Sequence, residues 1–233
     1  MTYVNGLLAN WLAAESNFKA NLYNGDGASA VEIVEASTRP WLVLTAPHAV
    51  NHCRAGAQKL ADRGTGGLVR VLSSVLGCFG VITARQSRTD ASYDELDDFK
   101  NALAKLPFPI GAIIDFHGMS NQRDLDVEMG FGLLPTVHSK TMAVKIGTSL
   151  ERANLRVAYN EKYVSLNPKS ITNWALSLDI PSIQVELAAR ARPPLGDTTT
   201  CATLMTTLER VLRVDAPEAL WQSPSTERPS NFV

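Results

Sequence analysis

The sequence predicts an α/β fold, a three-layer α/β/α sandwich with a central, mostly parallel sheet. Short runs rich in apolar and β-branched residues alternate along the chain with stretches of helical periodicity. Several of these runs are apolar throughout, which is typical of strands buried on both faces of a sheet. We expect residues 1–221 to form one domain, followed by a flexible tail over residues 222–233, which are rich in Ser and Pro.

The first predicted element is an amphipathic helix over residues 4–16, because apolar side chains recur there at helical spacing. Residues 24–27 (NGDG) end this helix, since Gly and Asn favour turns. Two β-rich runs of strand length then follow at 31–36 (VEIVEA) and 41–46 (WLVLTA), with a turn-like Arg-Pro pair at 39–40 between them.

The remaining elements continue the alternation of strands and helices. Strands are expected in three further apolar runs, at 80–84 (GVITA), 110–116 (IGAIIDF) and 182–187 (SIQVEL). Helices are expected where the periodicity is near 3.6, at 66–77, 92–105, 139–152 and 198–213. This order of elements predicts the parallel part of the sheet.

The composition narrows the classes of function. The chain has 233 residues, of which 45% are hydrophobic and 19% charged, which is enough apolar material for a large core. The net charge is -1, and no basic run with interleaved aromatic residues follows the pattern of a nucleic-acid surface. No apolar run approaches the roughly 20 residues that cross a bilayer. We therefore expect neither nucleic acid nor a membrane as a partner.

A cytoplasmic location is expected from two further features. The N-terminus lacks the basic segment and apolar core of a secretory signal. The three cysteines, Cys53, Cys78 and Cys201, are odd in number and lie outside any C-x-x-C spacing, which argues against a disulfide framework and a thiolate zinc site.

Polar side chains gather at the ends of three predicted strands. His48 follows the strand at 41–46, His117 follows the strand at 110–116, and Glu186 lies near the end of the strand at 182–187. In open α/β sheets the ligand crevice lies outside the carboxyl ends of the strands. The sequence has four histidines in total, so two of them at this edge predict a functional site.

These residue types suit a single catalytic zinc ion. Such a site needs about three N or O ligands, with a carboxylate nearby to take a proton from water. His48 and His117 are the expected ligands and Glu186 the expected general base. Asp115 points to the same face of its strand as His117, so we expect it to orient that imidazole ring.

Three runs resemble the N-formylglutamate amidohydrolase family, a zinc-dependent group with the phosphorylase/hydrolase-like fold of zinc carboxypeptidases. They are TAPHAVNH (45–52), IIDFHGMSNQRDLDVEMG (113–130) and IQVEL (183–187), and the resemblance extends from about residue 40 to residue 192. It implies that His48 and His117 bind zinc and that Glu186 is the catalytic base.

The third ligand is left open between Asp62 and His52. Carboxypeptidase-like proteins commonly have a Glu three residues after the first ligand histidine, where this chain has Asn51. The run ADRGTGGL (61–68) resembles the acid-x-Gly-Thr run of poly-γ-glutamate hydrolases, which favours Asp62. His52 would replace it if a helix began directly at His48, because that helix would place both imidazoles on one face.

Several side chains are candidates for substrate binding. Arg123 resembles the family arginine that faces the substrate carboxylate, and its alternative role is a surface ion pair with a neighbouring aspartate. Arg88 and Arg190 are further candidates for the carboxylate, and Asn51 is a candidate for orienting the substrate amide.

The sequence therefore predicts a zinc-dependent hydrolase with one Zn²⁺ per chain. The expected reaction is cleavage of a C–N amide bond in a small N-acyl amino acid or a γ-glutamyl or peptide-like substrate that carries a carboxylate. The alternatives are a zinc carboxypeptidase-like peptidase and a catalytically silent protein of the same fold that binds a carboxylate or a peptide.

Overall fold

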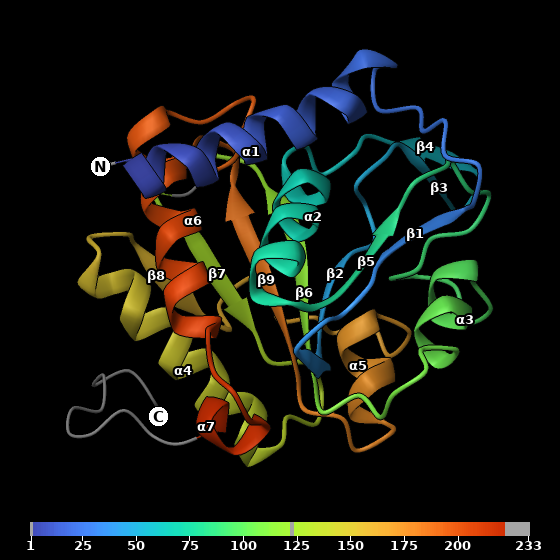
Figure 1. Ribbon diagram of the computed structural model, residues 1–233. Helices are drawn as coiled ribbons and strands as arrows, with labels where there is room; N and C mark the ends of the chain where they lie inside the picture. The colour runs from blue at the N-terminus through green and yellow to red at the C-terminus, as the bar shows by residue number, and fades with distance from the viewer. Residues whose placement is uncertain (1, 122–123, 222–233) are drawn as a thin grey trace.

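A seven-stranded mixed sheet forms the centre of the protein in a computed structural model that describes residues 2–121 and 124–221 (Figure 1). Its strand order is β1-β5-β2-β6-β9-β7-β8. The strands are β1 (Val31–Val34), β2 (Arg39–Ala46), β5 (Cys78–Thr83), β6 (Ala112–Met119), β7 (Val127–Gly130), β8 (Val157–Tyr159) and β9 (Ser182–Ala188). A separate hairpin consists of β3 (His52–Arg54) and β4 (Ala57–Lys59).

Four strands that are adjacent in the sheet, β5, β2, β6 and β9, run parallel to one another. The edge strand β1 is antiparallel to β5, and β7 is antiparallel to β9 but parallel to β8. The carboxyl ends of β2, β6 and β9 therefore meet at one edge of the sheet. The predicted fold class, with its mostly parallel sheet, is confirmed.

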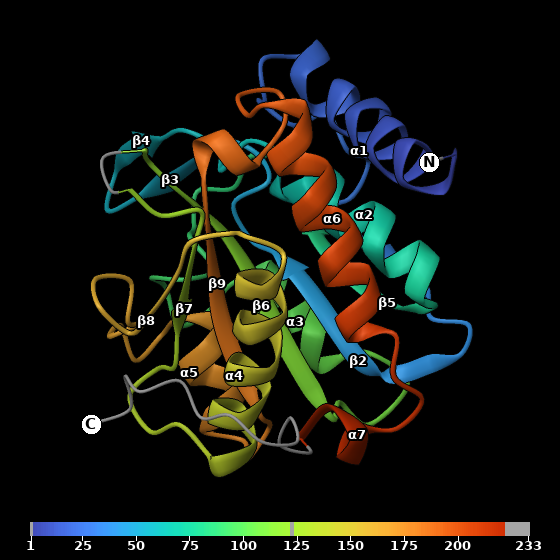
Figure 2. The same cartoon turned by 90° about the vertical axis from the view of Figure 1, so that its left-hand side faces the viewer.

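Helices cover both faces of this sheet (Figures 1 and 2). One face packs against α2 (Thr65–Leu76), α4 (Val137–Arg152) and α6 (Thr198–Leu212). Helix α1 (Thr2–Ala20) lies on the outer side of α2 and α6, and α7 (Pro217–Trp221) packs against α4. The other face packs against α3 (Asp98–Ala104) and α5 (Ile171–Leu176). A short 3-10 helix, η1 (Ala189–Ala191), follows β9 directly.

The two faces of the sheet hold separate hydrophobic clusters. In β6, Ile114 and Phe116 belong to the larger cluster, whereas Ile113 belongs to the smaller one beneath α3 and α5. Because side chains alternate along a strand, Asp115 and His117 point to the same face as Ile113. The polar residues of β6 therefore lie on the face with the smaller apolar core.

The predicted helix over 92–105 is wrong in its first half. The side chain of Asp97 accepts a hydrogen bond from the backbone N–H of Phe99, so α3 begins only at Asp98. Residues 92–97 form a loop instead. The short elements β3, β4, β7, β8 and α5 were not predicted, because three to six residues are too few for a clear periodicity.

No helix in the described part of the chain is both long enough and apolar enough to cross a membrane. The predicted tail over 222–233 lies outside the described residues.

Candidate metal centre

The three predicted strand ends are neighbours in the sheet. His117 of β6 is paired in register with Glu186 of β9, and Asp115 of β6 is paired with Thr45 of β2. His48 follows β2 after the turn at Pro47. Residues far apart in the sequence therefore meet because three consecutive strands of the sheet run in the same direction.

Three donor atoms form a nearly equilateral triangle. Nδ1 of His48 lies 3.1 Å from Nδ1 of His117, and Oδ2 of Asp62 lies 3.3 Å from the first and 3.4 Å from the second. Tetrahedral zinc with N and O ligands at about 2.0–2.1 Å has edges of about 3.3 Å between ligand atoms. The triangle therefore has the size and the donor types that zinc requires, and each atom comes from a different segment of the chain.

The outward nitrogen of each histidine is held by a buried carboxylate. Nε2 of His117 lies 3.0 Å from Oδ2 of Asp115, which also accepts a hydrogen bond from Thr45 at its other oxygen. Nε2 of His48 lies 2.9 Å from Oδ1 of Asp90. With both Nε2 atoms held in this way, the Nδ1 lone pairs face the centre of the triangle. The predicted contact between Asp115 and His117 is present.

Asp62 reaches the triangle from the loop before α2 rather than from the helix itself. Its backbone N–H donates to the carbonyl of His48, and its own carbonyl accepts from Thr65. The loop is tied to α1, since the carboxylate of Glu15 accepts from the backbone N–H groups of Gly64 and Gly67 at 2.6 and 3.1 Å. This attachment fixes the segment that carries Asp62.

The burial of Glu15 disfavours its charged form. Burial raises the pKa of Glu15 to about 7, although hydrogen bonds from the two backbone N–H groups act in the opposite direction. The residue therefore changes its charge near neutral pH at the base of the loop that carries Asp62.

His52 lies on the far side of His48. No helix begins at His48, because a turn at 47–48 leads into β3 instead, so the condition under which His52 would replace Asp62 is not met. The two imidazole rings nevertheless stack, with centroids 4.2 Å apart. Nε2 of His52 lies 3.3 Å from Oδ2 of Asp90, so His48, His52 and Asp90 form a second group of possible metal donors.

The second group is less suited to a cation than the first. Nε of Arg54 donates to Oδ2 of Asp90 at 2.6 Å, which places a guanidinium beside the carboxylate that a metal would need. Asp90 also uses Oδ1 to accept from His48 and from the backbone of Ser92. We therefore interpret Asp90 as the carboxylate that orients His48.

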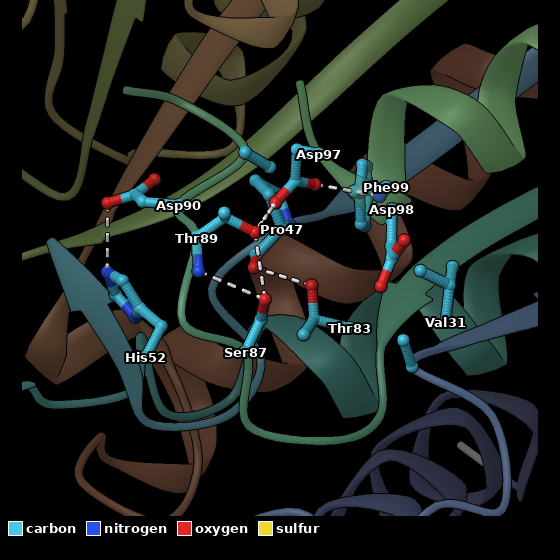
Figure 3. Close-up of a pocket in the computed structure, with 12 residues that line it drawn as sticks. Val31, Pro47, His52, Thr83, Ser87, Thr89, Asp90, Asp97, Asp98 and Phe99 are labelled. Atoms are coloured by element: carbon cyan, nitrogen blue, oxygen red, sulfur yellow. Dashed lines mark hydrogen bonds and ion pairs between the residues drawn. The ribbon is translucent and has the colours of Figure 1, made fainter. Parts of the chain in front are cut away.

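The segment that carries Asp90 is held in place by hydrogen bonds of side-chain hydroxyl groups (Figure 3). Thr89 donates to the carboxylate of Asp97 at 2.6 Å, and its hydroxyl lies 2.8 Å from that of Ser87. In Figure 3, His52 and Asp90 point toward each other beside this network. Asp90 could not be found from the sequence, because it lies in an irregular loop that offers no periodic signal.

The charges around the triangle favour a bound cation. Burial alone would lower the pKa of His48, but hydrogen bonds to Asp62 and Asp90 outweigh burial and raise it. Burial would likewise lower the pKa of His117, but the charge of Asp115 and its hydrogen bond raise it well above its ordinary value. The carboxylates therefore stabilise positive charge here, which a metal ion supplies when it displaces the protons.

Glu186 faces the same cavity as the three donors. The cavity has a volume of about 330 Å³ and is lined by His48, Arg54, Asp62, Ser92, Tyr93, His117, Gly118, Tyr163, Ser165, Leu166, Asn167, Ser170, Gln184 and Glu186. Gln184 donates to the carboxylate of Glu186 at 2.9 Å. Burial raises the pKa of Glu186 to about 7, although the positive charge of His117 acts in the opposite direction.

The predicted substrate-binding residues do not gather at this cavity. Asn51 is buried among Leu22, Asn24 and Ala61, and its side-chain amide bonds to all three. Its position does not support the predicted role of orienting the substrate, because the amide is used to hold the fold together.

The predicted arginines also lie elsewhere. Arg190 pairs with Asp124 and Asp126, and Arg88 is an exposed residue that does not line the cavity. The carboxylate-binding role predicted for these two arginines is therefore not supported by their positions. Arg123 lies outside the described residues.

Arg54, which was not predicted from the sequence, lines the cavity instead. Asp90 holds its Nε atom, and its two terminal nitrogens make no hydrogen bond or ion pair with any residue that the structure describes. Its side chain is 37% exposed. The only sequence signal was its place shortly after His48 in a run without regular structure.

Solved structures with a similar fold are known, although the sequence alone finds no match. Neither a protein-family model nor a curated protein matches the sequence. Among solved structures, the gene product Atu2144 from Agrobacterium tumefaciens is similar, with a TM-score of 0.59 and 14% identity over 79% of this chain and 94% of that one.

Two similar structures have described activities. A bacteriophage poly-γ-glutamate hydrolase has a TM-score of 0.53 and 12% identity, over 80% of this chain and 89% of that one. The N-formylglutamate amidohydrolase from Ralstonia eutropha JMP134 has a TM-score of 0.52 and 14% identity, over 79% of this chain and 96% of that one. The resemblance that the sequence motifs indicated is therefore confirmed at the level of the fold.

Proposed function

We propose that this protein is a zinc-dependent amidohydrolase that cleaves a C–N amide bond in a small N-acyl amino acid or a γ-glutamyl or peptide-like substrate. The observation that carries the proposal is the donor triangle of His48, Asp62 and His117, which opens into the same cavity as the carboxylate of Glu186. The shared fold with an amidohydrolase and a poly-γ-glutamate hydrolase supports it.

The donor set favours zinc over the common hard cations. Two imidazole nitrogens and one carboxylate oxygen suit a borderline-soft ion, whereas Mg²⁺ and Ca²⁺ prefer oxygen ligands alone. His48, Asp62 and His117 would hold the ion and leave a fourth position toward the cavity. Bound there, zinc would supply a Lewis acid for the reaction.

Glu186 would carry a proton from the attacking water to the amide nitrogen of the substrate. Its carboxylate would accept a proton from the attacking water as the new C–O bond forms at the amide carbonyl carbon. It would then give this proton to the amide nitrogen as the C–N bond breaks, so that a carboxylic acid and an amine leave the site. Gln184 positions Glu186 for this exchange, because it donates a hydrogen bond to one of the two carboxylate oxygens.

Arg54 is the cation that we assign to the substrate carboxylate, in place of Arg88 and Arg190. A guanidinium binds a carboxylate through two parallel charged hydrogen bonds, and among the described residues none holds the two terminal nitrogens of Arg54. The cavity volume of about 330 Å³ lies at the lower end of small-molecule sites, which favours a compact substrate.

A catalytically silent binding protein is the weaker alternative. That hypothesis arose from Asn51, which stands where carboxypeptidase-like proteins have an acidic ligand. Asp62 brings a carboxylate to the donor triangle from a different segment, so the lack of an acidic residue at position 51 no longer argues against metal binding.

The experiment compares His117→Ala with His138→Ala, which changes an exposed histidine stacked on Trp221. Bound zinc is measured by elemental analysis, and hydrolysis is measured with N-formyl, N-acetyl and γ-glutamyl amino acids. We expect the first variant to lose zinc and activity and the second to keep both. Full zinc content and full activity in His117→Ala would refute the proposal.

A further inference from the structure

Arg192 is a buried cation that does not line the cavity beside the donor triangle. It follows η1, and 4% of its surface is exposed. The described residues provide no carboxylate within ion-pair distance of its guanidinium, although Asp62, Glu186 and Glu15 act on it from further away. A buried charge is costly unless its hydrogen bonds are satisfied, so its contacts require an explanation.

The guanidinium donates to three backbone carbonyls. Its Nε donates to Leu187 at 2.9 Å, one terminal nitrogen donates to Met119 at 3.1 Å, and the other donates to Arg63. Leu187 and Met119 lie at the ends of adjacent strands, whereas Arg63 lies in the loop before α2. One side chain thus connects three separate segments.

Each of these carbonyls closely follows a residue of the candidate site. Arg63 comes directly after Asp62, Leu187 comes directly after Glu186, and Met119 comes two positions after His117. The distances between the side chains of Asp62, His117 and Glu186 therefore depend on the backbone positions that Arg192 holds.

Gly118 makes room for the guanidinium, and Gly64 makes room for the base of the same side chain. A Cβ atom on Gly118 would lie 2.6 Å from Cζ of Arg192, so the guanidinium packs directly on the backbone beside His117. A Cβ atom on Gly64 would lie 2.8 Å from Cβ of Arg192, and Gly64 also has a φ of 95°, which favours glycine. The glycine of the His-Gly motif is thus explained by the space that Arg192 occupies.

We infer that Arg192 is a positioning residue that sets the spacing of Asp62, His117 and Glu186 by binding the backbone next to each of them. The inference rests on the proposed function for the purpose of this spacing, but the three contacts exist without a metal. Arginine suits the task because its planar fork directs donors to three carbonyls at once, which the single ammonium of lysine does not.

The test compares Arg192→Lys with Arg39→Lys. Arg39 is a matched control, because its guanidinium also donates to backbone carbonyls, those of Val214 and Leu76, but at the start of β2, away from the site. Amide hydrogen exchange of the metal-free proteins reports on the backbone, and competition with a chromophoric chelator gives the zinc dissociation constant. The visible spectrum of the Co²⁺ form reports on the ligand geometry.

We expect Arg192→Lys to speed exchange about tenfold in segments 61–65, 117–120 and 187–189, to weaken zinc binding about tenfold and to alter the Co²⁺ spectrum. Arg39→Lys should leave all three unchanged. Equal effects of the two variants on these readouts would overturn the inference, since both would then act only through overall stability.

Gly118→Ala gives a second route to the same answer if Arg192→Lys fails to fold. The added methyl displaces the guanidinium without removing it, so the same three segments should exchange faster; unchanged exchange there would overturn the inference. If the wild-type protein binds no zinc, the proposed function fails, whereas the exchange data still decide the role of Arg192.

Discussion

Nε2 of His48 lies 2.9 Å from Oδ1 of Asp90, a residue 42 positions further along the chain. The contact leaves Nδ1 of the same ring facing Asp62 and His117. Asp90→Asn should therefore weaken zinc binding 10- to 100-fold, the range typical of carboxylates that orient a ligand histidine. Zinc titration against a competing chelator measures this, with the exposed Asp98→Asn as the control. Unchanged zinc affinity in Asp90→Asn would contradict this assignment of Asp90.

The third ligand can be decided with two variants. Asp62→Ala removes one corner of the donor triangle and should lower the zinc content of the purified protein to a small fraction of one per chain. His52→Ala removes only the ring that stacks on His48 and should leave zinc bound. The opposite pattern, with zinc lost from His52→Ala alone, would assign the metal to the group around Asp90.

Replacement of Glu186 should separate metal binding from catalysis. Glu186→Gln keeps the shape of the side chain but removes the proton acceptor, so kcat should fall at least about 100-fold. Zinc content should stay at the wild-type level, because Glu186 is not part of the donor triangle. Steady-state kinetics and elemental analysis on the same preparation check both expectations. Wild-type kcat in this variant would exclude Glu186 as the base.

Arg54→Gln should alter substrate recognition more than the chemical step. For an N-acyl amino acid with a free carboxylate we expect KM to rise at least about tenfold, because a charged bidentate contact is lost. For the corresponding carboxamide, KM should change little. A similar rise in KM for both substrates would show that Arg54 does not recognise the carboxylate.

Glu15 should make stability depend on pH. Its folded pKa of about 7 lies above the ordinary value of 4.5, so the folded state binds the proton more tightly than the unfolded state. The free energy of unfolding should therefore fall by a few kcal/mol as the pH rises from about 4.5 to above 7, and this loss should be smaller in Glu15→Gln. Urea unfolding of metal-free protein across this range measures the slope. The exposed Glu95→Gln is the control, and an identical slope in all three proteins would contradict the prediction.

The sequence itself determined the sheet and the strand-end residues. Apolar runs of strand length indicated β2, β5, β6 and β9, because buried parallel strands leave a continuous hydrophobic pattern. The period of two along a strand placed Asp115 and His117 on one face, whatever the order in which the strands pair. His48, His117 and Glu186 could be found because each stands out at the end of such a run.

Only the tertiary structure decided which loop residues complete the site. Asp90 and Arg54 lie in segments without periodicity, so nothing in their local sequence distinguishes them from other acidic residues or from Arg88 and Arg190. Asp62 and His52 were both possible third ligands from the sequence, and the fold brings Oδ2 of Asp62 within 3.3 and 3.4 Å of the Nδ1 atoms of His48 and His117. Arg192 acts through backbone carbonyls, which every residue has, so its role depends on how the chain folds back on itself rather than on any pattern of side chains.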